Sequence, residues 1–211
     1  MLDQIPKYEI HRNFFSDDLA DRLLEYALAN EGSFYETNVR SGSDHSVRVS
    51  RGLRNLGAMG PEIDGIVRAL VPEFSAGLGI SRFDVSRVEL ELVAHGDGAF
   101  YKRHVDTLTG EPDDRGKHDR VVSGVYYFHA MPKGFSGGAL RLSPLRAGGE
   151  LFEDVQPEHN SFVVFPSFAA HEVMRVSCPS GAFRDSRFAI NCWMCRAATP
   201  ARAPARAAGT E

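Results

Sequence analysis

The sequence predicts a mainly β domain preceded by supporting helices. Before about residue 83, apolar residues recur at intervals of three and four, which is the helical period. From residue 84 the period changes, and short runs of β-forming residues alternate with clusters of Gly, Pro and Asp as far as Met194. Because no helical segment separates these runs, we expect antiparallel strands arranged as a sandwich or a jelly roll.

The chain is expected to fold as a single domain. Its 211 residues, of which 43% are apolar, are enough to bury a substantial core. We place this domain over residues 1–196, with helical N-terminal support in 1–83 and the β core in 84–196. Residues 197–211 are rich in Ala, Arg and Pro, and a disordered tail is expected there.

Two amphipathic helices are expected ahead of the β core. Ser16 is a typical N-cap followed by acidic residues, so the first helix begins there and ends near Gly32. The second runs from about Pro61 to Leu78. Both carry an apolar stripe that should pack on a sheet, formed by Leu19, Leu23, Tyr26 and Ala27 and by Ile63, Ile66, Val67 and Leu70.

The β core is expected to contain six short strands. Each is a β-rich run bounded by turn-forming residues. The runs are Arg87–Val93, Val121–Phe128, Ala139–Leu142, Ser161–Phe165, His171–Val176 and Arg187–Met194.

Charge and composition favour small molecules or protein segments as partners. A formal net charge of −4 and a pI near 6.1 offer no broad basic surface, so nucleic acid is not expected. The start of the chain is too polar for a leader, and no apolar run has the length of a membrane span. We therefore expect a cytoplasmic protein with no membrane partner, and the composition leaves its oligomeric state open.

The cysteines indicate a reducing compartment and no disulfide framework. They are few and odd in number: Cys178, Cys192 and Cys195. Cys192 and Cys195 form a CxxC, but it ends a strand-like run instead of opening a helix, and no second pair of zinc ligands accompanies it. Neither redox chemistry nor a zinc knuckle is expected.

Two irregular segments are candidates for contact with a substrate. Thr107–Asp119 is rich in charge and follows directly after a metal motif, so it is either a solvated connection or a mobile lid. The segment from Arg40 to Arg54 contains several arginines and is expected to form a solvated basic edge, with an anion-binding surface as the alternative.

Three residues of the β core are suited to hold a metal ion. His104 and Asp106 lie two apart, so on a strand both point to one face while Val105 faces the core. His171 begins a later strand and can complete the site from across the barrel. Two imidazoles and one carboxylate on one face of a metal are typical of non-haem Fe(II). A zinc hydrolase could use the same ligands, but it would need a general base beside the bound water.

An arginine in the last strand favours the iron site. Alternation places Arg187, with Ala189, Asn191 and Trp193, on the face opposite to Phe188, Ile190 and Met194. An arginine inside a barrel needs an anion, and a dicarboxylate co-substrate would supply one. Tyr127 could donate a hydroxyl hydrogen bond to the same carboxylate. The alternative is a structural ion pair of Arg187 with Asp185 or Glu172.

Several motifs in the same order resemble the prolyl-4-hydroxylase-like branch of the Fe(II)/2-oxoglutarate-dependent dioxygenases, especially the hypoxia-type prolyl hydroxylases and their bacterial relatives. The resemblance covers residues 85–196. The motifs are Tyr101-Lys-Arg-His-Val-Asp, Gly124-Val-Tyr-Tyr-Phe, Ser136-Gly-Gly-Ala-Leu-Arg-Leu, His171-Glu-Val and Arg187-Phe-Ala-Ile-Asn-Cys-Trp.

The resemblance implies a fold, a reaction and a set of site residues. The fold is a double-stranded β-helix, or jelly roll, with N-terminal supporting helices. The reaction converts 2-oxoglutarate and O2 into succinate and CO2 while an unactivated C–H is hydroxylated, with ascorbate as a candidate additional cofactor. Iron would be held by His104, Asp106 and His171; 2-oxoglutarate by Arg187 and Tyr127, between walls formed by Val125, Leu140 and Asn191; and substrate by Arg120, Trp193, Tyr101 and Arg103.

One position departs from the family pattern, and several functions remain open. Ala94 stands where those relatives have a tyrosine, which implies a roomier co-substrate pocket unless His95 or Tyr101 compensates. The resemblance favours a prolyl residue in a protein or peptide as substrate, with a free amino acid or another metabolite as the alternative. Asp106 argues against a halogenase, which needs a small residue at that position. A non-catalytic jelly-roll sensor is the competing hypothesis outside the enzymes.

Overall fold

The computed structural model describes residues 2–37, 45–107, 118–146 and 151–198. The segments 38–44, 108–117, 147–150 and 199–211 lie outside the described residues, and with them most of the expected lid and nearly all of the expected tail. Ala197, which we assigned to the tail, is the last residue of a strand.

Both expected helices are confirmed. Helix α1 spans Asp17–Ala29, and the Ser16 side chain accepts a hydrogen bond from the amide of Leu19, as an N-cap does. Helix α2 spans Met59–Leu78 and ends at Gly79, whose φ of +71° is the left-handed conformation that favours glycine. No helix in the described part of the chain is long and apolar enough to span a membrane.

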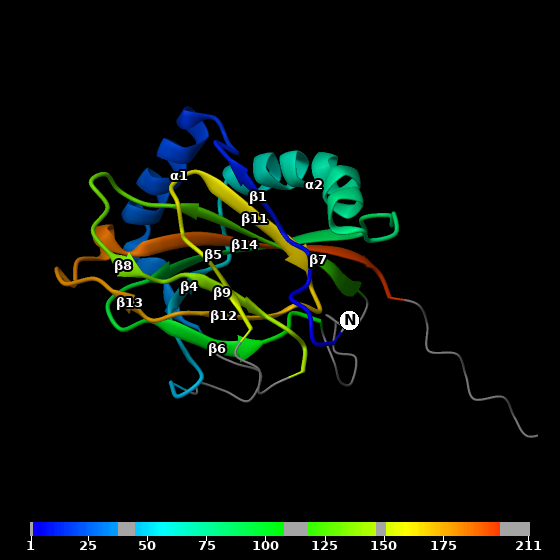
Figure 1. The fold of residues 1–211 in the computed structure, drawn as a ribbon. Helices are drawn as coiled ribbons and strands as arrows, with labels where there is room; N and C mark the ends of the chain where they lie inside the picture. Colours follow the sequence, from blue (N-terminus) through cyan, green and yellow to red (C-terminus); the bar gives the residue numbers. More distant parts are fainter. Residues whose placement is uncertain (1, 38–44, 108–117, 147–150, 199–211) are drawn as a thin grey trace, which may run out of the picture.

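The described strands form two facing antiparallel sheets, which confirms the predicted mainly β jelly-roll class. The larger sheet has the order β1-β11-β7-β14-β5-β4-β2 and the smaller one the order β10-β9-β12-β6-β3, with β8 and β13 as a separate pair. Figure 1 shows α1 and α2 lying on the outer face of the larger sheet, with the smaller sheet on its other side.

The strand bounds for the larger sheet are β1 Glu9–Arg12, β2 Tyr35–Glu36, β4 Arg51–Leu53, β5 Arg87–His95, β7 His118–Phe128, β11 Ser161–Pro166 and β14 Arg187–Ala197. Those for the other strands are β3 Arg48–Val49, β6 Phe100–His104, β8 Ser136–Gly137, β9 Leu140–Ser143, β10 Glu153–Val155, β12 Ala170–Val173 and β13 Val176–Ser177.

Strand β14 separates two cores, as its alternation predicts. Phe188, Ile190 and Met194 lie in the apolar core between the larger sheet and the helices. Ala189 lies in the second core, between the two sheets. Each expected strand is present, but the predicted run His171–Val176 is divided into β12 and β13.

The sequence did not predict the shortest strands. Four of them, β1 to β4, lie within residues 1–83, so this part of the chain contributes to both sheets besides providing helices. They are two to four residues long, too short to show a period of two. Strand β6 was missed as well, because an irregularity in its pairing with β12 interrupts the alternation.

Candidate metal and co-substrate site

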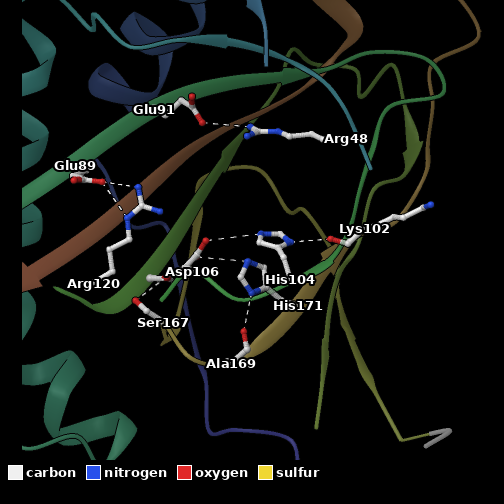
Figure 2. Close-up of polar contacts among 11 residues, drawn as sticks. Arg48, Glu89, Glu91, Lys102, His104, Asp106, Arg120, Ser167, Ala169 and His171 are labelled. Atoms are coloured by element: carbon white, nitrogen blue, oxygen red, sulfur yellow. Dashed lines mark hydrogen bonds and ion pairs between the residues drawn. The ribbon is translucent and has the colours of Figure 1, made fainter. Parts of the chain in front are cut away.

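The three expected metal ligands converge at one end of the space between the sheets. His104 is the last residue of β6 and His171 lies in β12, where the two are direct cross-strand partners. One ligand atom from each of His104, Asp106 and His171 lies within 4.8 Å of the others. Figure 2 shows the three side chains pointing toward one another. His171 therefore completes the triad from the neighbouring strand and not from across the barrel.

Asp106 lies beyond the end of strand β6 and is held by contacts with two other segments of the chain. Strand β6 ends at His104, and the Asp106 amide donates to the Ser167 carbonyl at 2.9 Å. The Ser123 hydroxyl donates to Asp106 Oδ2 at 2.7 Å and lies 3.0 Å from the Ser167 hydroxyl. The prediction that Val105 faces the core was wrong: it is 40% exposed, because the strand geometry on which the prediction depended has already ended.

Backbone carbonyls orient both histidines. Nδ1 of His104 lies 2.8 Å from the Lys102 carbonyl, and Nδ1 of His171 lies 2.9 Å from the Ala169 carbonyl. Since a carbonyl only accepts, each Nδ1 carries the proton and each Nε2 presents a lone pair. The Nε2 atoms lie 3.8 Å and 3.6 Å from the carboxylate of Asp106. This is the tautomer that a histidine needs in order to bind a metal through Nε2.

The surroundings favour the metal-binding protonation states of His104 and Asp106. Burial is the main influence on His104. It lowers the pKa of His104 to about 3, assisted by the positive charge that His171 would carry when protonated. Burial alone would raise the pKa of Asp106, but the two imidazoles and the Ser123 hydrogen bond lower it below its ordinary value. Two neutral imidazoles and one carboxylate are a donor set that fits Fe(II).

A bulge in β6 decides which of its side chains reach the site. His104 pairs with His171 and Tyr101 with Val173, so two residues of β6 oppose one residue of β12. Tyr101 and His104 consequently share a face, and their rings stack with centroids 3.6 Å apart. Arg103 is turned away and donates to the carbonyls of Pro144 and Leu145. The expectation that Arg103 contacts substrate does not agree with this placement.

Arg187 is a buried cation held by neutral groups. It is 1% exposed; Nε donates to the Gly138 carbonyl at 2.8 Å, and Nη1 lies 3.2 Å from Nδ1 of His95. Neither Asp185 nor Glu172 pairs with it, and no other carboxylate in the described ranges does so. Burial without a counter-ion lowers its pKa below the ordinary value. The structural ion pair that we considered for Arg187 is therefore absent from the described residues.

Two buried polar atoms at this end lack a hydrogen-bond partner within the described chain. They are Nη2 of Arg187 and the hydroxyl of Tyr127. The guanidinium carbon lies 4.7 Å from the centre of the Tyr127 ring, so both residues belong to one cluster. Buried donors without an acceptor are costly, and an anion such as a carboxylate would satisfy them. The residues present thus fit the distal end of a dicarboxylate.

One cavity of about 1040 Å³ contains both the triad and Arg187. Its lining includes the predicted wall residues Val125, Leu140 and Asn191 and three of the predicted substrate residues, Arg120, Trp193 and Tyr101. Tyr127 does not line it directly, since it is fully buried behind the guanidinium.

Two ion pairs from β5 stand beside the triad. Arg120 donates to Glu89 at 2.6 Å, and its guanidinium lies 3.8 Å from the centre of the Trp193 ring. Arg48 bonds Glu91 at 3.3 Å and lies over the Tyr101 ring at 4.8 Å. Figure 2 shows both pairs near the three ligands. Arg48 is mostly buried in this pair, so the prediction of a solvated basic edge was wrong at this residue.

Ala94 does not enlarge the co-substrate end. Its side chain packs in the core beneath the helices, because even-numbered residues of β5 face that core while Glu89, Glu91 and His95 face the cavity. His95, which we considered as a compensating residue, is the cavity-facing neighbour and contacts Arg187.

Sequence reasoning missed the residues around the ligands: Ser123 and Ser167, which support Asp106, and Glu89 and Glu91, which pair with arginines beside the triad. No sequence motif contains Ser123, Ser167, Glu89 or Glu91. The carbonyls of Lys102 and Ala169 belong to the backbone, so a pattern of side chains cannot predict their contacts. Glu89 and Glu91 did offer one signal, since two carboxylates alternate with apolar residues in a run that reads as a strand.

Comparison with known proteins now identifies the family. Residues 90–195 match the family model of the 2OG-Fe(II) oxygenase superfamily, which is half of the chain. The chain belongs to this superfamily. Its members use Fe(II), 2-oxoglutarate and O2, in agreement with the donor set and the unpaired cation described above.

Individual relatives agree with this assignment. A protein of Synechocystis sp. described as an uncharacterized PKHD-type hydroxylase is 31% identical over 191 residues, covering 87% of this chain. The present chain spans 61% of that relative's length.

Solved structures show the same fold. A Pseudomonas putida prolyl-4-hydroxylase has a TM-score of 0.66 at 23% identity, covering 92% of this chain and 95% of its own. A Trichoplax adhaerens prolyl hydroxylase, in complex with a hypoxia inducible factor peptide fragment, has a TM-score of 0.67 at 19% identity, with coverages of 90% and 83%.

Proposed function

We propose that this chain is an Fe(II)/2-oxoglutarate-dependent dioxygenase that hydroxylates an unactivated C–H, with a prolyl residue of a protein or peptide as substrate. The observation that carries the proposal is that one cavity holds both a His-Asp-His triad and a buried Arg187 that pairs with no carboxylate of the described residues. A site for a metal and a site for a carboxylate in one cavity match the two components that this chemistry requires.

The triad residues would hold the iron. All three residues line the cavity, so a metal held by them would be accessible to a co-substrate in the same cavity. When bound, iron and 2-oxoglutarate supply the oxidation of the C–H, with succinate and CO2 as the co-products. The protein's part is to bind, to orient and to exclude water, and no acid or base side chain is assigned.

Arg187 would bind the distal carboxylate of 2-oxoglutarate. Its Nη2 and the Tyr127 hydroxyl are two donors that find no partner among the described residues, and both are buried, which strengthens a charge-assisted hydrogen bond. Val125, Leu140 and Asn191 would form the walls around the carbon chain of the co-substrate.

The substrate would enter on the side of Arg120, Trp193 and Tyr101. The cavity continues past these residues to the start of α2, where Arg54, Leu56 and Pro61 line it, so its extent suits a segment of polypeptide. The fold shared with prolyl hydroxylases supports the same choice. A free amino acid is the second candidate, because the paired charges of Arg48–Glu91 and Arg120–Glu89 on the wall would complement a zwitterion.

A succinate-release assay tests the proposal. Iron-loaded protein and 2-oxoglutarate are incubated in separate reactions with proline-containing peptides or with free amino acids. Mass spectrometry then detects products that have gained one oxygen atom. Peptide hydroxylation coupled to succinate is the expected result, and a hydroxylated amino acid would favour the second candidate. His171→Ala serves as the inactive control.

Anaerobic titration separates an oxygenase from a sensor or a hydrolase. Addition of 2-oxoglutarate to the Fe(II)-loaded protein should produce a metal-to-ligand charge-transfer band. Absence of the band would contradict the dioxygenase proposal, while a band without succinate release on any substrate would favour a binding module.

A further inference from the structure

Arg187 is anchored in an unusual way for a buried cation. Its hydrogen-bond partners in the described residues are the Gly138 carbonyl and the ring of His95, and neither carries a negative charge. The Tyr127 ring, which its guanidinium also contacts, is uncharged as well. His95 lies directly opposite Arg187 in the β5–β14 register and is itself only 4% exposed. From this geometry we infer that His95 is a positioning residue: as a neutral acceptor it fixes the guanidinium for the co-substrate carboxylate. The inference rests on the proposed function.

The contact determines the protonation of His95. A guanidinium has only donors, so Nδ1 of His95 must accept the hydrogen bond from Nη1 at 3.2 Å. The ring is therefore neutral, with its proton on Nε2. The surroundings agree, because burial together with the charges of Arg187 and Arg48 lowers the pKa of His95 well below its ordinary value.

The second anchor depends on the absence of a side chain at Gly138. A Cβ atom there would lie 2.6 Å from Cδ of Arg187, and the φ of this residue is +70°. Glycine thus lets the arginine side chain pass close to the backbone and donate from Nε to the carbonyl at 2.8 Å. With Nε and Nη1 both engaged, the guanidinium plane is fixed and Nη2 is the nitrogen left without a partner.

A neutral anchor has a different effect from a carboxylate. Aspartate or glutamate in place of His95 would also orient the guanidinium, but it would neutralise the charge and compete with the incoming ligand. Imidazole and carbonyl orient it while leaving the full positive charge for the ligand, which is preorganisation without competition. The identity of residue 95 should therefore control co-substrate affinity.

A matched pair of variants isolates the charge of the anchor. The side-chain oxygen of His95→Asn or His95→Asp can occupy the place of Nδ1, and the two variants differ in charge alone. The dissociation constant of 2-oxoglutarate is measured by calorimetry on Mn(II)-loaded full-length protein, and Mn(II) affinity is measured separately. H95N should bind 2-oxoglutarate within about threefold of the unmodified protein, while H95D should bind it at least about tenfold more weakly. Mn(II) affinity should be unchanged in both.

Pyruvate provides the internal control, since it has the 2-oxo acid group but no distal carboxylate. The two variants should bind it equally, because the affected contact is absent from that ligand. Equal 2-oxoglutarate affinities for H95N and H95D would overturn the inference, as would a parallel loss of pyruvate binding in H95D.

A third variant tests whether a folding defect explains the loss of binding. The same measurements distinguish failure of the proposed function from failure of the role of His95. His95→Phe keeps a buried ring but removes the acceptor, and it should weaken 2-oxoglutarate binding about tenfold with little change in thermal stability. Unaltered binding in H95F would also overturn the inference. If the unmodified protein binds no 2-oxoglutarate, the proposed function fails; if it binds but residue 95 has no influence, only the role of His95 fails.

Discussion

The two ends of the cavity are prepared by different parts of the fold. At the metal end, the ligands lie at the end of β6, just after it and in β12, and the contacts that orient them come from backbone carbonyls and from the Ser123 hydroxyl of β7. At the other end, Arg187 lies at the start of the long strand β14, and its position follows from sheet register. At both ends, however, neutral groups hold the charged residue, so its charge remains available for a ligand. The first end suits a cation and the second an anion.

Loss of a metal ligand should have the largest effect of any change at either end. Asp106→Ala removes the carboxylate of the triad and leaves two imidazoles with no compensating charge. Fe(II) binding and succinate release are both expected to fall to background. They can be followed by metal analysis after desalting and by the succinate assay. Retention of a full equivalent of iron would contradict the assignment of Asp106.

Loss of the cation should affect the other end alone. Arg187→Ala removes a charge-assisted hydrogen-bonding group, and 2-oxoglutarate affinity should fall about a hundredfold. Metal affinity should remain close to that of the unmodified protein, because Arg187 makes no contact with the triad residues. Calorimetry with each ligand tests this, and a comparable loss of metal affinity would mean that the two ends are not independent.

Removing a supporting hydrogen bond should have an intermediate effect at the metal end. Ser123→Ala deletes the hydroxyl that donates to Asp106 at 2.7 Å, and metal affinity should fall by roughly tenfold. A competition titration with a chelator measures the change. Ser161→Ala is the matched control, since Ser161 is an equally buried serine whose hydroxyl donates instead to the Glu158 carbonyl. Equal losses in both variants would point to general destabilisation.

Acid should weaken the metal-free protein through both ends. Burial lowers the pKa of His104 from 6.5 to about 3, and it lowers that of His95 well below the same value. Because the unfolded chain then binds more protons, stability present above pH 6.5 is lost progressively as the pH falls toward 3.

Denaturant unfolding of the metal-free protein tests this dependence. Between about pH 7 and pH 5 the loss due to His104 should be on the order of 1–2 kcal/mol, and His95 should add to it in the same direction. H95N should reduce the slope of stability against pH, and so should His104→Gln. A profile that is flat over this range, or a slope that neither variant changes, would contradict the buried neutral state of these rings.

The parts of this molecule that follow from local patterns could be predicted from sequence. The helices could be predicted because an N-cap and an apolar stripe lie within one short stretch of sequence. The two faces of β14 could be predicted because the strand is long enough to show several alternations of side-chain direction. His104, Asp106, His171 and Arg187 were found because their residue types are restricted by chemistry.

What escaped prediction depends on tertiary contacts. The exposure of Val105 and the outward turn of Arg103 follow from where a strand ends or bulges, and the burial of Ala94 follows from which face of β5 the helices cover. The support of Asp106 by Ser123 joins residues from different strands and turns, and no local pattern encodes it.

Because of the bulge in β6, the side chains that reach the site depend on the number of residues in this short strand. Tyr101 and His104 are three residues apart and would lie on opposite faces of a regular strand. The extra residue of the bulge between them brings both side chains to the face of the site. Deleting Lys102 or Arg103 would restore a regular strand, in which Tyr101 would keep its face but the spacing to the metal ligand would become two. Because residues two apart share a face of a regular strand, the tyrosine would still lie beside the first histidine, so this pair of rings can be kept at a spacing of three with a bulge or at a spacing of two without one.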